Sequence, residues 1–293
     1  MPVMLEGGCR VSHMHDGAPL VEGRLRIWSQ VGRATGAQAI SLRVMEFAAG
    51  MSPAIRNDDC DEILYVLNNS ESAANYDRVA VADSSQGQAQ SAPPLDQDSK
   101  DHAHPEGVRR TKELATIFID GNGHEITPNT GIYIRPNGTF AIDNAGPESI
   151  TIISSQCPDP DRSPQFVSPP TSRSTANVPA PIVRLADQRA QPTADRWYRV
   201  MVDGGIGSAA TQFVGSIPPG RAPDHFHNYE EVLFILRGEG RMWAGGTNTP
   251  IAPGSCIYLP KGQVHCVENT GTGELRLLGV FYPAGSPSVR YDV

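Results

Sequence analysis

The sequence has 293 residues and a formal net charge of −8, from 24 lysines and arginines against 32 aspartates and glutamates. This length suits about two domains, and each half can bury a core of its own. The acidic balance, without a basic patch, argues against nucleic acid as a partner. No apolar run is long enough for a signal peptide or a membrane span, so we expect no membrane partner either.

The cysteines indicate a reducing environment. They are five in number and scattered along the chain: Cys9, Cys60, Cys157, Cys256 and Cys266. An odd, scattered set argues against a disulfide framework and predicts a cytoplasmic protein. We interpret Cys256 and Cys266, which lie close to the motif described below, as small core residues.

Short apolar runs between glycine, proline and asparagine breaks recur along the chain. They cover residues 39–47, 62–67, 115–120, 131–134 and 150–154 in the first half, and 197–202, 211–217, 232–236, 241–244, 256–259 and 275–282 in the second. Long helical periodicity is absent. Short strands with turn signals predict an all-β protein built as a sandwich or barrel.

The two halves of the chain resemble each other. Residues 39–50 parallel 210–220, residues 62–67 parallel 231–236, and residues 131–138 parallel 254–262. Such self-similarity indicates two copies of one β unit. We therefore predict an N-terminal domain at 1–157, a proline- and serine-rich linker at 158–178 and a C-terminal domain at 179–293. A polar stretch at 68–110 is interpreted as a long hairpin insertion in the first copy.

The C-terminal half contains a group of residues of the types that bind metals. His225 and His227 are separated by one residue, so their side chains share a face of a strand. Glu231 has the same parity and joins them if the strand stays regular. His265 comes from a second strand, after a proline–glycine turn at 260–262. Three imidazoles and a carboxylate are a usual ligand set for a divalent transition metal.

This double motif resembles that of the cupin superfamily, whose small jelly-roll barrels carry a metal inside. The matching positions are Gly220, His225, His227, Glu231 and Gly238, with one residue fewer after Gly220 than in the family pattern, and then Gly254, Pro260, Gly262, His265 and Asn269. The resemblance implies an all-β bicupin with two tandem double-stranded β-helix barrels. It also implies that His225, His227, Glu231 and His265 hold one divalent transition metal, which can be Fe, Mn, Ni, Cu or Zn.

The first copy of the repeat has lost these ligands. Its His-x-His positions fall at Arg56 and Asp58, or one residue earlier at Ile55 and Asn57, and its late histidine position falls at Ala141. Glu62 remains, but a lone carboxylate does not hold a transition metal. We interpret this barrel as a degenerate partner; the alternative is an organic-ligand site formed by Arg56, Asp58 and Glu62. Two other pairs, His13 with His15 and His102 with His104, lack a following glutamate in register and are interpreted as loop residues.

The resemblance predicts a metal-dependent oxidoreductase, and more specifically a dioxygenase, that acts on a small oxygenated or aromatic molecule. Glu231 is the candidate catalytic residue, because a carboxylate that loosens from the metal can take a proton from a substrate hydroxyl. The candidate substrate-binding residues are Gln212, Tyr229, Arg237, Trp243 and Tyr258.

Two other function classes stay open. One is non-oxidative metal catalysis by a hydrolase, isomerase or lyase, as in bicupins that resemble ureidoglycine aminohydrolase. The other is a non-enzymatic cupin that binds a small molecule. The runs 232–236 and 275–282 are apolar on both faces, which suits burial between barrels or subunits and leaves a homodimer open.

Overall fold

The computed structural model describes residues 1–68, 115–169, 181–289, 291 and 292. Nearly all of the predicted insertion at 68–110, the His102/His104 pair and residues 170–178 of the predicted linker lie outside the described residues. The described chain is nearly all β, as predicted. Among these residues, no helix combines the length and the apolar character needed to cross a bilayer.

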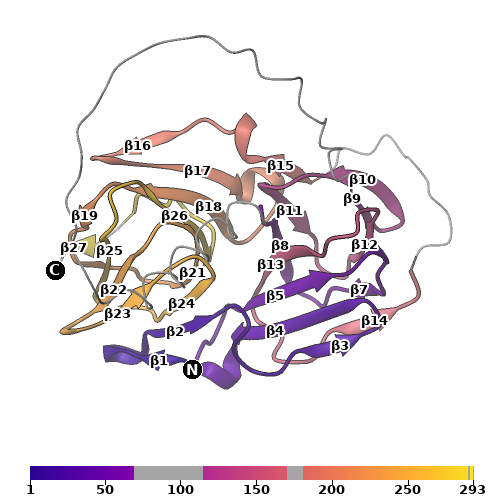
Figure 1. The fold of residues 1–293 in the computed structure, drawn as a ribbon, viewed down its shortest axis with the longest axis horizontal. Helices are drawn as coiled ribbons and strands as arrows, with labels where there is room; N and C mark the ends of the chain where they lie inside the picture. The colour runs from indigo at the N-terminus through magenta and orange to yellow at the C-terminus, as the bar shows by residue number, and fades with distance from the viewer. Residues whose placement is uncertain (69–114, 170–180, 290, 293) are drawn as a thin grey trace, which may run out of the picture.

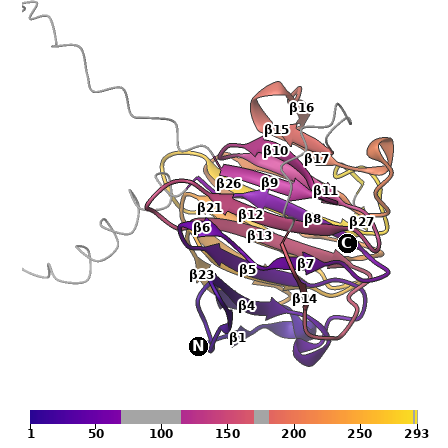
Figure 2. The same cartoon turned by 90° about the vertical axis from the view of Figure 1, so that its right-hand side faces the viewer.

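The strands form two barrels that lie side by side (Figure 1), each made of two antiparallel sheets. In the first barrel, one sheet has the order β15 (Ile182–Arg184), β11 (Thr130–Ile134), β8 (Asp61–Val66), β13 (Ile150–Cys157), β5 (Leu42–Phe47), β4 (Leu25–Val31) and β3 (Leu20–Glu22). Figure 2 shows β11, β8, β13, β5 and β4 of this sheet lying side by side. The facing sheet has the order β10 (Asn122–Ile126), β9 (Ala115–Ile119), β12 (Thr139–Asn144), β7 (Ala54–Arg56) and β14 (Gln165–Val167), with β6 (Gly50–Met51) paired to β12.

The second barrel repeats this plan. Its larger sheet has the order β1 (Val3–Met4), β2 (Arg10–His13), β24 (Ser255–Leu259), β21 (Glu230–Arg237), β26 (Leu275–Tyr282), β18 (Thr211–Ile217), β17 (Arg196–Val202) and β16 (Gln191–Thr193). The facing sheet has the order β23 (Thr247–Ile251), β22 (Gly240–Ala244), β25 (His265–Asn269), β20 (His225–Phe226) and β27 (Tyr291–Asp292), with β19 (Gly220–Arg221) paired to β25. Short 3-10 helices occur at Glu6–Gly8 (η1), Arg33–Thr35 (η2), Leu185–Asp187 (η3) and Gly204–Ile206 (η4).

Buried apolar side chains form three clusters. One fills the first barrel and includes Phe47, Leu64 and Phe140. A second fills the second barrel and includes Leu233 and Ile257. The third cluster lies between the barrels, where every second side chain of β8 packs against the second barrel and every second side chain of β21 packs against the first. This packing explains why these strands are apolar on both faces.

One strand from each half of the chain pairs with a sheet of the other barrel. β2 pairs with β24 of the second barrel, with Val11 opposite Ile257. In return, β15 pairs with β11 of the first barrel, with Val183 opposite Gly131. The domain boundaries at 157 and 179 remain predictions, but two strand pairings cross between the predicted halves, one made by β2 near the start of the chain and one made by β15 just after residue 179. One member of the His13/His15 pair, His13, is therefore on a strand rather than in a loop, opposite Ser255.

Polar contacts between the barrels are also reciprocal. The Asp61 carboxylate accepts from the backbone N–H of Ala209 and from the Tyr133 hydroxyl at 2.8 Å, and that hydroxyl lies 3.2 Å from the Gly207 carbonyl oxygen. Asp61 is 5% exposed, so its charge is held by donors from both barrels.

The matching contact comes from the second barrel. The Glu230 carboxylate accepts from the Tyr258 hydroxyl at 2.6 Å and from the backbone N–H groups of Gln38 and Ala39 at 2.9 and 2.7 Å. The Tyr258 hydroxyl lies 3.4 Å from the Gly36 carbonyl oxygen. The two carboxylates thus anchor one pseudo-symmetric interface.

Candidate metal centre

Three histidines of the second barrel converge on one point. His225 on β20 lies directly opposite His265 on β25, and His227 follows β20 by one residue. Their ring centroids are 4.6 Å (His225–His265), 5.0 Å (His225–His227) and 5.2 Å (His227–His265) apart. Each offers a nitrogen atom, and these atoms all lie within 4.8 Å of one another. One divalent ion can therefore reach all three imidazoles.

Backbone carbonyls orient two of the imidazoles. The Nδ1 atom of His225 lies 3.0 Å from the Pro223 carbonyl oxygen, and that of His265 lies 2.8 Å from the Gln263 carbonyl oxygen. A carbonyl oxygen only accepts, so each Nδ1 carries the proton and donates. Each Nε2 is left with a lone pair, which is the tautomer that a metal ligand needs.

Glu231 reaches the site from the opposite sheet. It lies on β21, and its Oε2 atom is 3.4 Å from the His227 Nε2 atom. The ligand atoms of the three histidines lie within 4.8 Å of one another, and Glu231 is not part of that group. The regular strand expected from His225 to Glu231 does not form, because β20 ends at Phe226 and β21 begins at Glu230. The chain turns between the two sheets, and Glu231 faces the histidines across the barrel.

Burial sets the protonation of the metal-free site. Burial, reinforced by the neighbouring imidazoles, lowers the pKa of His227 to about 3 and that of His265 to about 4. Burial raises the pKa of Glu231 to about 8. Near pH 7 the imidazoles of His227 and His265 are therefore neutral and lie beside a mostly protonated Glu231 carboxyl group. A set of neutral imidazole donors and one nearby carboxyl group fits a divalent transition metal.

A cavity of about 140 Å³ opens beside these residues. His225, His227, His265 and Glu231 form one part of its wall. The rest is largely apolar, with a few polar side chains at Thr193, Arg196, Ser216 and Ser288, and the apolar part includes Trp197, Phe213, Leu233, Val267 and Leu277. Pockets for drug-sized ligands are ~300–1,000 Å³, so this cavity suits a smaller molecule.

A glycine makes room for one wall of the cavity. Phe213 on β18 is paired with Gly279 on β26, and a Cβ atom at position 279 would lie 2.4 Å from the Phe213 ring. The aromatic side chain can lie across the neighbouring strand because Gly279 has no side chain.

Comparison with known proteins agrees with this architecture. Residues 213–281 match the family model described as a Cupin domain. The second barrel is thus a cupin domain, and the chain has the two-barrel bicupin fold. The matched segment covers β18 to β26, and it contains all four candidate ligand residues of this bicupin.

Curated relatives align with about a fifth of the chain. The oxalate-binding protein of Thermotoga maritima is 38% identical over 66 residues, which is 22% of this chain and 54% of that protein. Auxin-binding protein 1 of Arabidopsis thaliana is 33% identical over 70 residues, or 21% of this chain and 35% of that protein. The aligned stretch thus spans about half or less of the length of these relatives.

Solved structures extend the likeness to both barrels. A serine-to-alanine mutant of Bacillus subtilis oxalate decarboxylase superposes with a TM-score of 0.64 at 12% identity, covering 94% of this chain and 77% of that one. A structure used to study the Mn(II) centres of the same enzyme gives 0.64 at 13% identity, covering 94% and 78%. At such low identity, the likeness shows the fold alone.

The corresponding place in the first barrel of the bicupin holds a different chemistry. Strand pairing puts Phe140 opposite both Ile119 and Ile55, just as His265 lies opposite both Ala244 and His225. Ile55 and Asn57 therefore occupy the positions of His225 and His227, and Arg56 and Asp58 do not. The late histidine position is Phe140 rather than the expected Ala141, because the turn after Pro136 is one residue shorter than the turn after Pro260.

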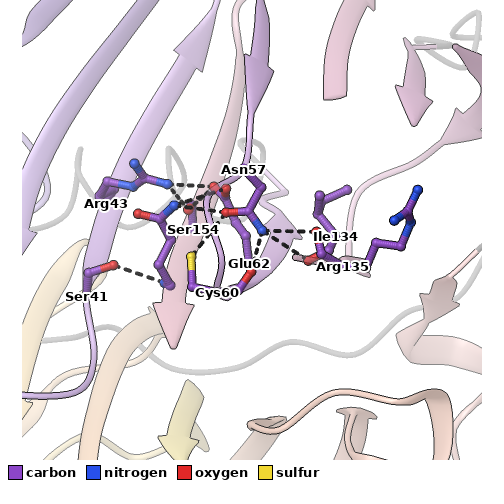
Figure 3. A network of polar contacts seen from close by, with 9 residues as sticks. Ser41, Arg43, Asn57, Cys60, Glu62, Ile134, Arg135 and Ser154 are labelled. Carbon is purple, nitrogen blue, oxygen red and sulfur yellow. Dashed lines mark hydrogen bonds and ion pairs between the residues drawn. The ribbon is translucent and has the colours of Figure 1, made fainter. Parts of the chain in front are cut away.

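A buried ion pair occupies the centre of this first-barrel site (Figure 3). The Arg43 Nη2 atom donates to Glu62 Oε1 at 2.6 Å, and the Ser154 hydroxyl donates to the same oxygen at 2.7 Å. Gln156 Nε2 lies 3.4 Å from the second carboxylate oxygen of Glu62. Glu62 is 0% exposed and Arg43 5% exposed, so the guanidinium supplies the positive charge inside the barrel.

The residues of the alternative organic-ligand site in this barrel have separate partners. Glu62 contacts Arg43 in the interior, whereas Asp58 forms an ion pair with Arg162 and accepts from Gln165 Nε2 at 2.9 Å. Arg56 is exposed. The structure does not bring Arg56, Asp58 and Glu62 together as one site.

Of the five residues predicted to bind substrate, Tyr229 lies nearest the candidate metal centre. Its ring stacks on His227 at 4.7 Å with an angle of 12° between planes, and on Phe281 at 4.5 Å. Tyr229 therefore packs against the His227 ring and is not among the residues that line the cavity.

The other four predicted residues lie away from the cavity lining. Gln212 and Tyr258 are buried between the barrels, where Gln212 Nε2 lies 3.4 Å from the Leu64 carbonyl oxygen. Trp243 is directed to the outer face of β22, with the Arg221 guanidinium 4.2 Å from its ring. Arg237 is exposed at the end of β21.

Sequence reasoning missed Arg196 and Phe213, which line the cavity. Phe213 could have been found from the repeat, because it corresponds to Arg43 of the first barrel. A basic residue in one copy and an aromatic residue in the other, at a position that faces the barrel interior, indicates different chemistry in the two interiors. Arg196 begins β17, far from the motif in sequence, and only the folded hairpin of β16 and β17 brings it to the cavity.

Proposed function

We propose that this bicupin is a metal-dependent enzyme that acts on a small oxygenated molecule in the cavity of its second barrel. In this proposal His225, His227, His265 and Glu231 hold one divalent transition metal. The observation that carries the proposal is the convergence of three imidazoles, two with their Nε2 lone pairs fixed by backbone carbonyls, on the wall of a cavity. When bound, such a metal acts as a Lewis acid toward a chelating substrate.

Glu231 is proposed as the proton-transfer group. Its carboxyl is 5% exposed and faces the cavity. When it loosens from the metal, the freed carboxylate can take a proton from a substrate hydroxyl. The apolar walls formed by Phe213, Leu233 and Leu277 keep bulk water from the reacting atoms.

For the reaction class, we propose carbon–carbon bond cleavage of a small carboxylate, which is a lyase reaction. The support is that both barrels superpose on oxalate decarboxylase and that a 66-residue stretch of the chain aligns with an oxalate-binding protein. The dioxygenase predicted from the sequence is the second candidate. The largely apolar lining, with Trp197 and Phe213, favours it because that lining suits an aromatic or apolar substrate.

Two measurements test the proposal. Elemental mass spectrometry should find about one equivalent of a transition metal in the native protein, lost in His225→Ala and retained in His15→Ala, an exposed histidine bound to Glu46. Carbon dioxide release and oxygen uptake are then followed with a panel of small mono- and dicarboxylates and phenols. Carbon dioxide without oxygen consumption supports the lyase, and stoichiometric oxygen uptake supports the dioxygenase. Absence of metal after reconstitution would overturn the catalytic proposal.

A further inference from the structure

Arg196 is the one guanidinium or ammonium group among the described residues that line the cavity. It lies on the hairpin of β16 and β17 and is paired with Thr193, which also lines the cavity. This hairpin runs along the upper edge of the second barrel in Figure 1. The cavity wall therefore holds a fixed positive charge on a different strand from any of the candidate metal ligands.

Most of the hydrogen-bonding capacity of Arg196 is unused. Its side chain is 19% exposed, and its Nε atom donates to Asp195 Oδ1 at 3.1 Å. Asp195 is 65% exposed, so this pair is weak and leaves the charge of Arg196 largely uncompensated. A guanidinium has five N–H donors, and this contact takes one of them. A largely buried guanidinium with free donors is built to receive an acceptor group.

Two other arginines near this strand already have partners. Arg199 donates to the Leu185 carbonyl oxygen at 2.9 Å, Arg276 forms an ion pair with Glu274, and neither lines the cavity. Arg196, by contrast, keeps donors for a ligand. A planar fork of this kind matches a carboxylate or a phosphate through two parallel hydrogen bonds, and the proposed substrate is a carboxylate.

We propose that Arg196 binds a carboxylate of the substrate that is remote from the metal. This inference rests on the proposed function and narrows it. The substrate class is then a small linear dicarboxylate with an apolar middle, one end at the histidines and the other at Arg196. Phe213 and Leu277 contact the chain between the two ends. In this proposal a two-carbon diacid binds at the metal alone.

The test is calorimetric binding to Mn(II)-loaded protein, with no turnover required. The probes are oxalate, the linear dicarboxylates from malonate to adipate, and monocarboxylates of equal length. Wild type should prefer at least one longer dicarboxylate to its monocarboxylate by about ten-fold or more, because bonds to charged groups are worth that factor. Arg196→Gln should abolish this preference and leave oxalate and the monocarboxylates unchanged. The control is Arg237→Gln, an exposed arginine at a strand end, which should change no affinity.

Three results would overturn the inference. The first is equal binding of dicarboxylates and monocarboxylates by wild type, which requires no variant. The second is an unchanged preference in Arg196→Gln that still holds its metal and its wild-type Tm. The third is tighter binding of a phosphonate analogue than of the dicarboxylate. Each of these leaves the metal proposal standing, whereas a protein that takes up no Mn(II) at the histidines refutes the metal proposal first.

Discussion

The ion pair inside the first barrel gives a sharp stability prediction. Replacing Arg43 by Met keeps much of the side-chain volume but leaves Glu62, which is 0% exposed, without its cation. The carboxylate would keep the Ser154 hydroxyl at 2.7 Å and the Gln156 amide at 3.4 Å, which are neutral donors. Removing one partner of a buried pair costs ~3–5 kcal/mol, so we expect a loss of that size in the free energy of unfolding at pH 7.

Urea unfolding followed by fluorescence and by circular dichroism measures this loss, provided that the two signals give coincident transitions. The double variant Arg43→Met with Glu62→Met removes both charges and should recover most of the stability, because apolar replacement of a buried pair is often neutral. The control is Arg135→Met, which breaks the exposed pair with Asp120 at 3.1 Å and should cost ~1 kcal/mol or less. A loss below about 1 kcal/mol in Arg43→Met, or a double variant as unstable as the single one, would refute the reasoning.

Three further predictions concern the second barrel and its interface. Because burial raises the pKa of Glu231 to about 8, metal uptake at pH 7 should release nearly one proton, and the metal affinity should rise with pH up to about 8. Calorimetry in buffers of different ionisation enthalpy measures the number of protons released. The variant Glu231→Gln should release none. Gly279→Ala should cost ~1–3 kcal/mol in urea unfolding, since its Cβ would lie 2.4 Å from the Phe213 ring, and adding Phe213→Ala should relieve most of that loss. Glu230→Gln should cost ~1–3 kcal/mol through its contacts with Tyr258 and the first barrel, and a change below 0.5 kcal/mol would contradict the role given to this contact.

The sequence was most informative where a local pattern fixes geometry. The all-β class and the two-barrel repeat follow from strand periodicity and internal similarity, and both are confirmed. The candidate ligands could be named because residue type and spacing agree over two motifs, and the structure brings His225, His227 and His265 together. Their role as metal ligands stays a prediction. The parity argument for Glu231 was wrong in its reason, because the chain leaves one sheet after Phe226 and enters the other at Glu230.

The cavity lining could not be read from proximity in sequence. Tyr258 and Gln212 lie beside the motif or on a core strand, but side chains on these strands alternate between the barrel interior and the neighbouring barrel. Tyr258 points to the neighbouring barrel, where its hydroxyl lies 3.4 Å from the Gly36 carbonyl oxygen. Arg196 reaches the cavity through a hairpin whose position depends on the whole fold. The strand exchange of β2 and β15 is likewise a long-range pairing with no local signal in either segment.

Adjacent residues of one strand tie the candidate chemistry to the assembly of the two halves. Glu230 is held by backbone N–H groups of the first barrel, and Glu231, the next residue, faces the cavity. An isolated fragment of residues 179–293 would lose those donors and also the strand β2 that covers the edge of β24. The first barrel thus combines an interior chemistry of its own, the Arg43–Glu62 pair, with an outer surface that holds the strand of Glu231 in place. Candidate chemistry in one half therefore depends on a half that lacks the histidines.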